Sequence, residues 1–207
     1  MQRLPSPPWR FAVSAIVQLL PAGTRLWRIY FRGRHAASWG SFRAFGPTAS
    51  RFDHHTRPKR VHPSRKILYA TNGPHAIETA LAEVFQDTSH IDRHTDKPRL
   101  AAFELTADVE LLDTGGKWPV RAGGGMAINS GSRRRAQDWS RAIYRNYSAI
   151  EGIAYPSSLT NEPCVALYER AEHAVLAATP IFDRSLADRR LLAPLTVTAG
   201  NLKYTIR

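Results

Sequence analysis

The stretch LYATNGPHAIETALAEVF, residues 68–85, joins a strand-like segment to a helix-like one. Leu68-Tyr69-Ala70 is short and apolar, as in a core strand, and Asn72-Gly73-Pro74 is typical of a turn. Pro74 suits the first turn of a helix, where its missing N–H has no hydrogen bond to lose. The stretch therefore predicts a strand over 67–71 and a helix over 74–87, with an apolar face made of Ile77, Ala80, Leu81, Val84 and Phe85.

An acid lies at the edge of that apolar face. Glu83 projects about 100° from the centre of the face, at the seam between core and surface, and Glu78 occupies the opposite seam. A glutamate at such a seam is usually solvated or forms half of a salt bridge. The spacing therefore raises the question of why an acid lies at this edge, but it cannot settle whether Glu83 has a function.

The rest of the chain predicts one compact α+β domain, with a mixed β-sheet core and flanking helices. Strands and helices mix without a regular strand-helix-strand alternation, which disfavours a doubly wound sheet. Residues 32–66 read as a long loop, and its interspersed aromatic side chains predict that it is ordered against a site. Further strands are expected over 25–31, 99–106, 109–114, 151–158 and 164–169, helices over 136–147 and 180–192, and a last hairpin from 195–200 and 202–207.

The N-terminal part, residues 1–20, is expected to be an extension of the domain at 21–207. The segment RFAVSAIVQLLPAG, residues 10–23, resembles a weak signal peptide, with a basic residue before an apolar run. That run is about ten residues long, too short to span a bilayer as a helix. We favour a helix over residues 10–20 that packs on the domain, and expect no membrane association.

The composition favours an anionic partner without choosing one. The chain has 207 residues, 43% of them hydrophobic, a formal net charge of +12 and a pI near 10.5. A folded single domain fits these values, and a wholly disordered chain does not. Nucleic acid, a phosphorylated small molecule and an acidic protein are all compatible with the charge, as is a solvated basic surface. The single cysteine, Cys164, excludes an internal disulfide and favours the cytoplasm.

Two arginines interrupt apolar surroundings. Arg28 lies inside the strand-like segment 25–31, where strand geometry places it on the same face as Leu26 and Tyr30. Arginine is seldom buried without a partner, and its fork suits a phosphate or a carboxylate. An edge-strand arginine in solvent is the alternative. Arg51 is the second, and for it the alternative is an ion pair with Asp53.

Other motifs exclude several classes of enzyme. Ser157 or Ser158 ends a strand, where a hydroxyl either caps the turn or bonds a ligand. The chain contains neither the Gly-x-Ser-x-Gly elbow of serine hydrolases nor a P-loop. His90 and His94 are four apart in a polar segment, which is a weak pattern, and no metal site is expected. Five arginines over 132–147 suit a nucleic-acid patch, a solvated helix face or a surface for an acidic partner.

Taken together, several segments resemble the RES domain, the toxin half of bacterial RES–Xre toxin–antitoxin pairs. Each motif alone is weak, but their order and spacing over roughly residues 20–170 are fairly specific. Ser50 departs from the pattern, because the family often has glycine before the motif arginine. The matching segments are LPAGTRLWRIYF (20–31), FGPTASRFD (45–53), ILYATNGPHAIETALAEVF (67–85), WSRAIYRNYSAIEGIAYPSS (139–158) and CVALYER (164–170).

The resemblance implies a fold like that of ADP-ribosyltransferases and a reaction on NAD+. RES domains cleave its nicotinamide–ribose bond by hydrolysis or phosphorolysis, which arrests growth. It implies that Glu83 and Arg28 are catalytic, with Glu83 stabilising an oxocarbenium-like state and Arg28 and Arg51 holding the phosphates. The other substrate-binding residues that it implies are Tyr69, Tyr30 and Ser157, with Ser158 as the second match for the motif serine.

The partners and alternatives also follow from the resemblance. NAD+ is a substrate and no cofactor is implied. A cognate Xre-type antitoxin is expected to carry a DNA-binding domain and a segment that blocks the toxin's pocket, and a homodimer within the complex is possible. The toxin itself is not expected to contact nucleic acid. A protein ADP-ribosyltransferase and a basic nucleic-acid-binding or RNA-cleaving toxin stay open as alternatives.

Overall fold

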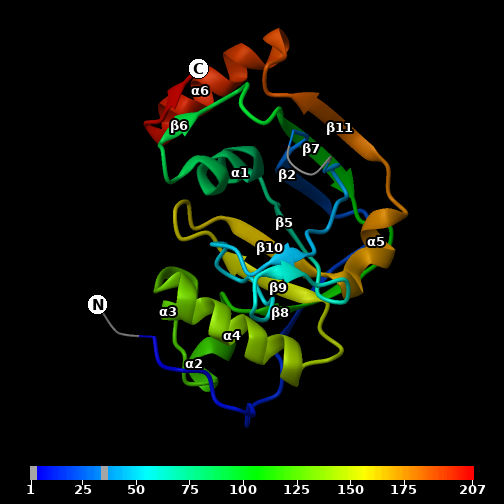
Figure 1. Cartoon of the computed structure of the whole chain (residues 1–207), viewed down its shortest axis with the longest axis vertical. Helices are drawn as coiled ribbons and strands as arrows, with labels where there is room; N and C mark the ends of the chain where they lie inside the picture. The colour runs from blue at the N-terminus through cyan, green and yellow to red at the C-terminus, as the bar shows by residue number, and fades with distance from the viewer. Residues whose placement is uncertain (1–3, 34–36) are drawn as a thin grey trace.

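A single mixed β-sheet organises the protein. The structure is a computed structural model that describes residues 4–33 and 37–207. The sheet has eight strands in the order β1-β8-β9-β10-β5-β2-β7-β11 (Figure 1). Neighbours are antiparallel except β8 and β9, which are parallel. The strands are β1 (Val17–Leu20), β2 (Arg25–Phe31), β5 (Ile67–Thr71), β7 (Pro98–Glu104), β8 (Val109–Asp113), β9 (Gly152–Pro156), β10 (Pro163–Tyr168) and β11 (Pro180–Ser185).

Short helices and two small ribbons complete the domain. The ribbons pair β3 (Phe45–Gly46) with β4 (Arg60–Val61), and β6 (His90–Ile91) with β12 (Thr205–Ile206). Two 3₁₀ turns cover Glu169–Ala171 and Arg189–Leu191. The helices are α1 (Ala76–Phe85), α2 (Trp118–Arg121), α3 (Ala127–Ser130), α4 (Arg133–Asn146), α5 (Glu172–Leu176) and α6 (Leu192–Leu202). Strands and helices in one domain confirm the predicted α+β class.

The central strand β5 buries both of its faces. Ile67 packs in a cluster with Trp118 of α2 and Trp139 of α4. Its neighbour Leu68 points to the other face and packs in a cluster with Val175 of α5. The alternation follows from the period of two in a strand, and both faces are apolar because helices cover both.

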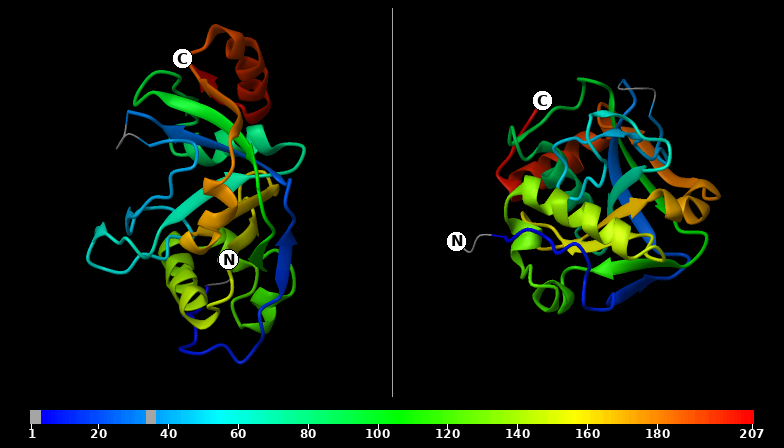
Figure 2. Two further views of the ribbon diagram at one scale, coloured as in Figure 1. Left: turned by 90° about the vertical axis from the view of Figure 1, so that its right-hand side faces the viewer. Right: turned by 60° about the horizontal axis from the view of Figure 1, so that its bottom comes forward.

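A third apolar cluster packs α1 and α6 against β2 and β7. Leu81 and Phe85 of α1 pack in it with Ile29 of β2. Leu195 and Ala199 of α6 lie four residues apart and join the same cluster, as helical periodicity requires. The bodies of α1 and α4 thus belong to different clusters, and α1 lies above α4 (Figure 1; Figure 2, left), although Arg133 at the start of α4 contacts Gln86 just after α1.

The sheet opens between β2 and β5. These strands pair only at Trp27 and Thr71. Further along β5, Ile67 pairs instead with Arg43 from the long connection, through N–H to O distances of 2.8 and 3.1 Å. The described part of the long connection that follows, residues 37–66, is ordered, as predicted, and its Phe52 is fully buried. The divergence of β2 from β5 leaves room for a site within the sheet.

The N-terminal segment corrects the helix predicted over residues 10–20. No helix forms in the described part of that segment, residues 4–20, and Val17–Leu20 pairs with β8 as a strand. The β-branched Val13, Ile16 and Val17 favour extended backbone. Upstream, the chain runs along α4, where Trp139 Nε1 donates to the carbonyl of Pro5 at 2.9 Å. The extension therefore packs on the domain, but not as a helix.

The C-terminal prediction is also wrong. Residues 180–192 begin with strand β11 rather than a helix, and the expected hairpin is replaced by α6 and the short strand β12. The segment 195–200 is expected from its sequence to be a strand, but the burial of Leu195 and Ala199, four residues apart, fits a helix. Lys203 ends that helix with a φ of 56°, in the left-handed conformation.

Candidate functional site

Helix α1 carries Glu83 to the opening between β2 and β5. Gly73 adopts a φ of +90° in the turn before the helix, a conformation that glycine reaches without strain. The helix buries Ala82 and Phe85 and leaves Val84 exposed, so Glu83 is half-buried at the seam between them. The position is the one that the sequence predicts, and the carboxylate lines a cavity rather than standing in open solvent.

A buried hydroxyl holds the Glu83 carboxylate. Ser157 is only 3% exposed, and its Oγ donates to Glu83 Oε1 at 2.6 Å. The same Oγ accepts the N–H groups of Leu159 and Thr160 at 3.1 and 3.3 Å, which fixes it in the turn after β9. Ser157 therefore supports Glu83 from behind, whereas the exposed Ser158 lines the cavity.

Arg28 is enclosed in the middle of the sheet. It lies on β2, which is an interior strand, so the alternative of an edge-strand arginine in solvent is excluded. Its Nη1 donates to the carbonyls of Trp39 and Ser41 at 2.9 and 3.1 Å. Its Nε is buried and has no hydrogen-bond partner among the described residues. Burial lowers the pKa of Arg28 to about 10. The hydrogen-bond acceptors of this guanidinium are neutral carbonyls.

Arg51 faces the same space. Its Nη1 donates to the carbonyl of Gly131 at 2.7 Å, and it forms no ion pair with Asp53, which excludes that alternative. Burial lowers the pKa of Arg51, the charge of Arg133 lowers it further, and Glu83 acts in the opposite direction. Within the described residues, neither Arg28 nor Arg51 has a carboxylate within ion-pair distance.

The two tyrosines play different parts. Tyr69 lines the cavity, its hydroxyl is buried, and no hydrogen bond of normal geometry reaches it from the described residues. Burial raises its pKa well above the usual value and outweighs the opposing effect of the Arg43 charge, so the phenol stays a neutral donor. The hydroxyl of Tyr30 is already engaged, because it donates to the carboxylate of Asp183 at 2.9 Å. Tyr30 contributes its ring to the wall.

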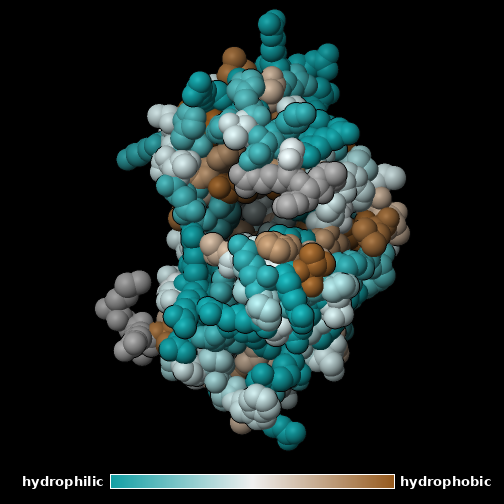
Figure 3. Space-filling model, in the orientation of Figure 1, coloured by the Kyte–Doolittle hydropathy of each residue, from teal (hydrophilic) through white to brown (hydrophobic). Residues whose placement is uncertain are grey.

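These side chains surround one cavity of about 690 Å³. Five of the six predicted site residues line it, namely Arg28, Tyr30, Arg51, Tyr69 and Glu83, and the sixth, Ser157, lies behind Glu83. The volume falls in the range of small-molecule and cofactor sites. The surface is hollowed on the face seen in Figure 3, between the upper and lower parts of the molecule.

Comparison with known proteins identifies the family. A family model of the RES domain matches residues 25–190. The chain belongs to the RES domain family. No match is found among curated proteins. The RES fold of this chain is also similar to a chain in the crystal structure of the M. tuberculosis MbcT–MbcA toxin–antitoxin complex, with a TM-score of 0.52 and 15% identity over 85% of this chain and 92% of that one.

Sequence reasoning missed several residues of this RES site. Arg43, Arg133 and Tyr155 line the cavity, and none was predicted. Arg133 was counted as part of a basic run, although it also begins α4, where it contacts Gln86 and lies 3.6 Å from Asp87. Tyr155 lies on β9, two residues before the predicted site residue Ser157, a proximity that could have indicated it.

A buried network under Arg43 shapes the loop that carries Arg51. Asp53 is fully buried and accepts from Arg43 Nη2 at 3.0 Å, from Thr48 N at 2.7 Å and from His55 Nδ1 at 2.6 Å. Burial alone would raise the pKa of Asp53, but these hydrogen bonds and the charge of Arg43 hold it well below its usual value. Arg43 is therefore neutralised, in contrast to Arg28 and Arg51.

In the described residues, no group of three or more His, Cys, Asp or Glu side chains could hold a metal ion. Cys164 is buried, and burial raises the pKa of its thiol far above the usual value, as expected of a packing residue. None of the helices in the described ranges has the length and apolar character needed to cross a membrane.

Proposed function

We propose that this RES protein is the toxin of a toxin–antitoxin pair and cleaves the nicotinamide–ribose bond of NAD+. One observation carries the proposal. A single cavity contains the Glu83 carboxylate, which accepts a hydrogen bond from the buried Ser157 hydroxyl, and two partly buried arginines, Arg28 and Arg51, that have no acidic partner among the described residues. A dinucleotide brings two phosphate charges and one scissile glycosidic bond, which matches this set of groups.

The two arginines supply the binding energy. Each guanidinium is held by backbone carbonyls and keeps further N–H groups for a ligand. Charge-assisted hydrogen bonds to phosphate are stronger than neutral ones, particularly where solvent is excluded. Binding the diphosphate would also relieve the cost of keeping Arg28 and Arg51 desolvated, because an anion replaces the lost water.

Glu83 stabilises the reacting ribose. When the bond between ribose C1′ and the nicotinamide nitrogen breaks, its electron pair leaves with nicotinamide, and positive charge develops on the ribose. A carboxylate beside that ribose lowers the barrier by electrostatic attraction. Ser157 fixes one carboxylate oxygen and leaves the other available to the cavity. Tyr69 supplies a neutral phenol that can donate to the nicotinamide amide or pack against its ring.

An acceptor completes the reaction. Water attack at C1′ gives ADP-ribose, nicotinamide and a proton, whereas phosphate attack gives ADP-ribose 1″-phosphate and nicotinamide. The cavity supports either acceptor, because both enter the space that nicotinamide vacates. Transfer to a protein side chain uses the same first step, so the products separate these outcomes.

The biological setting is also part of the proposal. The family and the fold shared with a chain of a toxin–antitoxin complex support an antitoxin partner. We place the protein in the cytoplasm, where NAD+ is available and a single free cysteine is stable. Depletion of NAD+ would arrest the host cell until the antitoxin covers the toxin.

The test follows nicotinamide release from NAD+ by purified protein, with and without phosphate. Glu83→Gln keeps the size and removes the charge, and we expect a loss of about 10²- to 10³-fold in rate, as for removal of one electrostatic stabiliser. Glu78→Gln is the matched control, because Glu78 lies on the same helix outside the cavity and contacts Asn201. Equal rates for Glu83→Gln and the parent would exclude the role of Glu83, and no release from folded parent would favour a protein or RNA target.

A further inference from the structure

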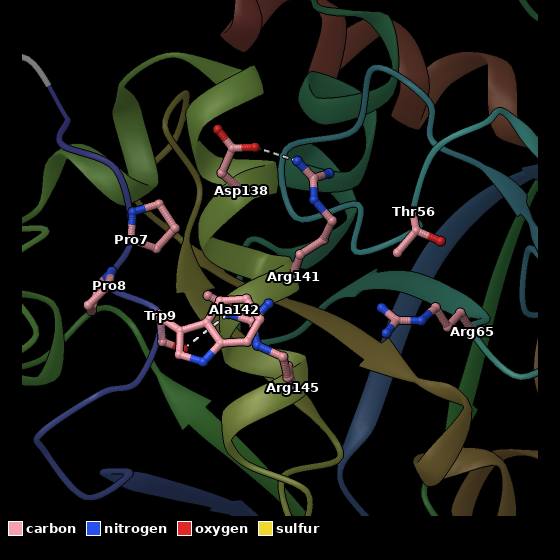
Figure 4. A pocket seen from close by; sticks show the side chains of 9 residues that line it. All are labelled: Pro7, Pro8, Trp9, Thr56, Arg65, Asp138, Arg141, Ala142 and Arg145. Atoms are coloured by element: carbon pink, nitrogen blue, oxygen red, sulfur yellow. Dashed lines mark hydrogen bonds and ion pairs between the residues drawn. The ribbon is translucent and has the colours of Figure 1, made fainter.

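A second concave site lies on the outer face of α4. It has a volume of about 350 Å³ and shares no lining residue with the RES cavity. Figure 4 shows Trp9, with Pro7 and Pro8, on one side of the helix and Thr56 and Arg65 on the other. Arg141 and Arg145 project from α4 between them. We call this site the α4 groove.

Two arginines of the α4 groove contact rings and backbone carbonyls but no acid among the described residues. Arg65 lies over the ring of Tyr144 at 4.5 Å and donates to the carbonyl of His54 at 3.1 Å. Arg145 lies over the indole of Trp9 at 4.1 Å and donates to the carbonyl of Trp9 at 3.1 Å. Rings and carbonyls orient both guanidinium groups but leave their charge uncompensated within the described chain.

The third arginine of the groove, Arg141, is only partly neutralised by an acid. Arg141 contacts Asp138, the single acid lining the groove, and that carboxylate also lies 3.5 Å from Arg135. One negative charge is thus divided between two arginines. The groove keeps a net positive charge and preformed N–H donors, which is the arrangement that carboxylates and phosphates bind.

The positive charge is concentrated in the part of the chain that supplies Arg65 to the groove and Arg28, Arg43 and Arg51 to the RES cavity. The first 77 residues contain 13 arginines and lysines and one acid, Asp53, so the formal charge of +12 resides there. Asp53 is buried and bound by Arg43. The N-terminal segment and the loop with Arg57, Lys59 and Arg60 flank the groove and are exposed. A charge asymmetry of this kind indicates an anionic partner.

Trp9 indicates that the partner is a polypeptide. Its side chain is 75% exposed, and tryptophan and arginine together are typical of interface hot spots. Binding of single-stranded nucleic acid usually relies on several aromatic platforms for successive bases. In the groove Trp9 offers one free ring face, because Arg145 occupies the other.

We infer that the α4 groove binds an acidic segment of a partner protein. Carboxylates of that segment would take the free donors of Arg65 and Arg145, and an apolar side chain would cover Trp9. The groove and the NAD+ cavity are separate, so occupation of the groove does not require the proposed reaction. The same segment can dock whether the cavity is empty or filled.

Fluorescence anisotropy of a labelled oligoglutamate peptide containing leucine tests this site in the full-length protein. The variant Arg65→Gln/Arg145→Gln should weaken binding at least about tenfold, since two charge-assisted contacts are lost. The matched control is Arg134→Gln/Arg189→Gln, which removes the same charge at exposed positions outside the groove and should change affinity less than about threefold. Trp9→Ala keeps every charge and should also weaken binding.

The outcomes separate a site from general attraction. Equal weakening by the groove variant and its control would show nonspecific binding and overturn the inference. Tighter binding of a single-stranded oligonucleotide of equal charge, lost in the groove variant, would assign the groove to nucleic acid instead. Thermal unfolding of each variant checks that the fold is kept. Nicotinamide release should match the parent in all of them, and it is read separately, so failure of the proposed reaction leaves the peptide result intact.

Discussion

The contact between Ser157 and Glu83 makes a quantitative prediction. Ser157→Ala removes a hydroxyl that donates to the carboxylate at 2.6 Å and is 3% exposed, so bulk water does not replace it freely. A hydrogen bond to a charged group is worth about 1.5–3 kcal/mol. If the bond serves to hold Glu83 in its productive position, the rate of nicotinamide release should fall about 10- to 150-fold.

Three variants and two kinetic constants test that role. Ser157→Ala should lower kcat with little change in KM, because the hydroxyl faces Glu83 and not the cavity. Ser157→Thr keeps a hydroxyl and should recover most of the rate. Ser158→Ala is the neighbouring control and should affect KM more than kcat. A folded Ser157→Ala protein with the parent's kcat would refute positioning by Ser157, and an effect on KM alone would mean that Ser157 contacts the substrate.

Three further predictions concern binding, the wall of the cavity and acid stability. NAD+ should raise the melting temperature of the parent but not of Arg28→Met, because the enclosed guanidinium is the proposed phosphate ligand; an equal increase in both proteins would exclude that role. Tyr30→Phe should lower stability by about 1–3 kcal/mol in urea unfolding through loss of the bond to Asp183, while nicotinamide release stays within about threefold of the parent; a larger loss of activity would place the hydroxyl in the reaction. Burial lowers the pKa of His54 from 6.5 to about 4. The unfolded state therefore binds more protons below pH 6.5, and stability should be full above that pH and fall by up to about 1.4 kcal/mol per pH unit toward pH 4. Urea unfolding of His54→Gln should lack this slope, and an unchanged slope would assign it to other groups.

The parts of the fold that sequence reasoning predicted are those with local signals. The strand at 67–71 and the helix that follows it combine a turn, a proline and a clear apolar period. In the N-terminal and C-terminal segments, the local signals do not agree on one type of secondary structure. Residues 10–20 are apolar at spacings that fit a strand or a helix, and pairing with β8 decides in favour of the strand. The segment 195–200 has strand-like composition, and packing on α1 and β2 overrides it.

The residues of the candidate site also differ in whether a local sequence signal predicts them. Arg28 could be recognised because a charge inside an apolar strand is unusual, and Glu83 because it sits at a seam. Arg43, Arg133 and Tyr155 carry no local signal of that kind. Arg43 reaches the cavity because the long connection replaces β2 as the partner of Ile67, and this pairing depends on the whole sheet. The support of Glu83 by Ser157 spans 74 residues of sequence and depends equally on tertiary structure.

The arginines explain why local rules fail at the site. A guanidinium that is buried against carbonyls costs folding free energy, because it loses water and gains no opposite charge. The protein bears that cost at both Arg28 and Arg51, while Arg43, a few residues from Arg51, is neutralised by Asp53. All three arginines line the cavity, but the fold neutralises Arg43, which shapes the loop, and leaves Arg28 and Arg51 without an acidic partner. Binding of an anion recovers part of the cost, so the residues that break the apolar pattern are the ones that a phosphate ligand stabilises most.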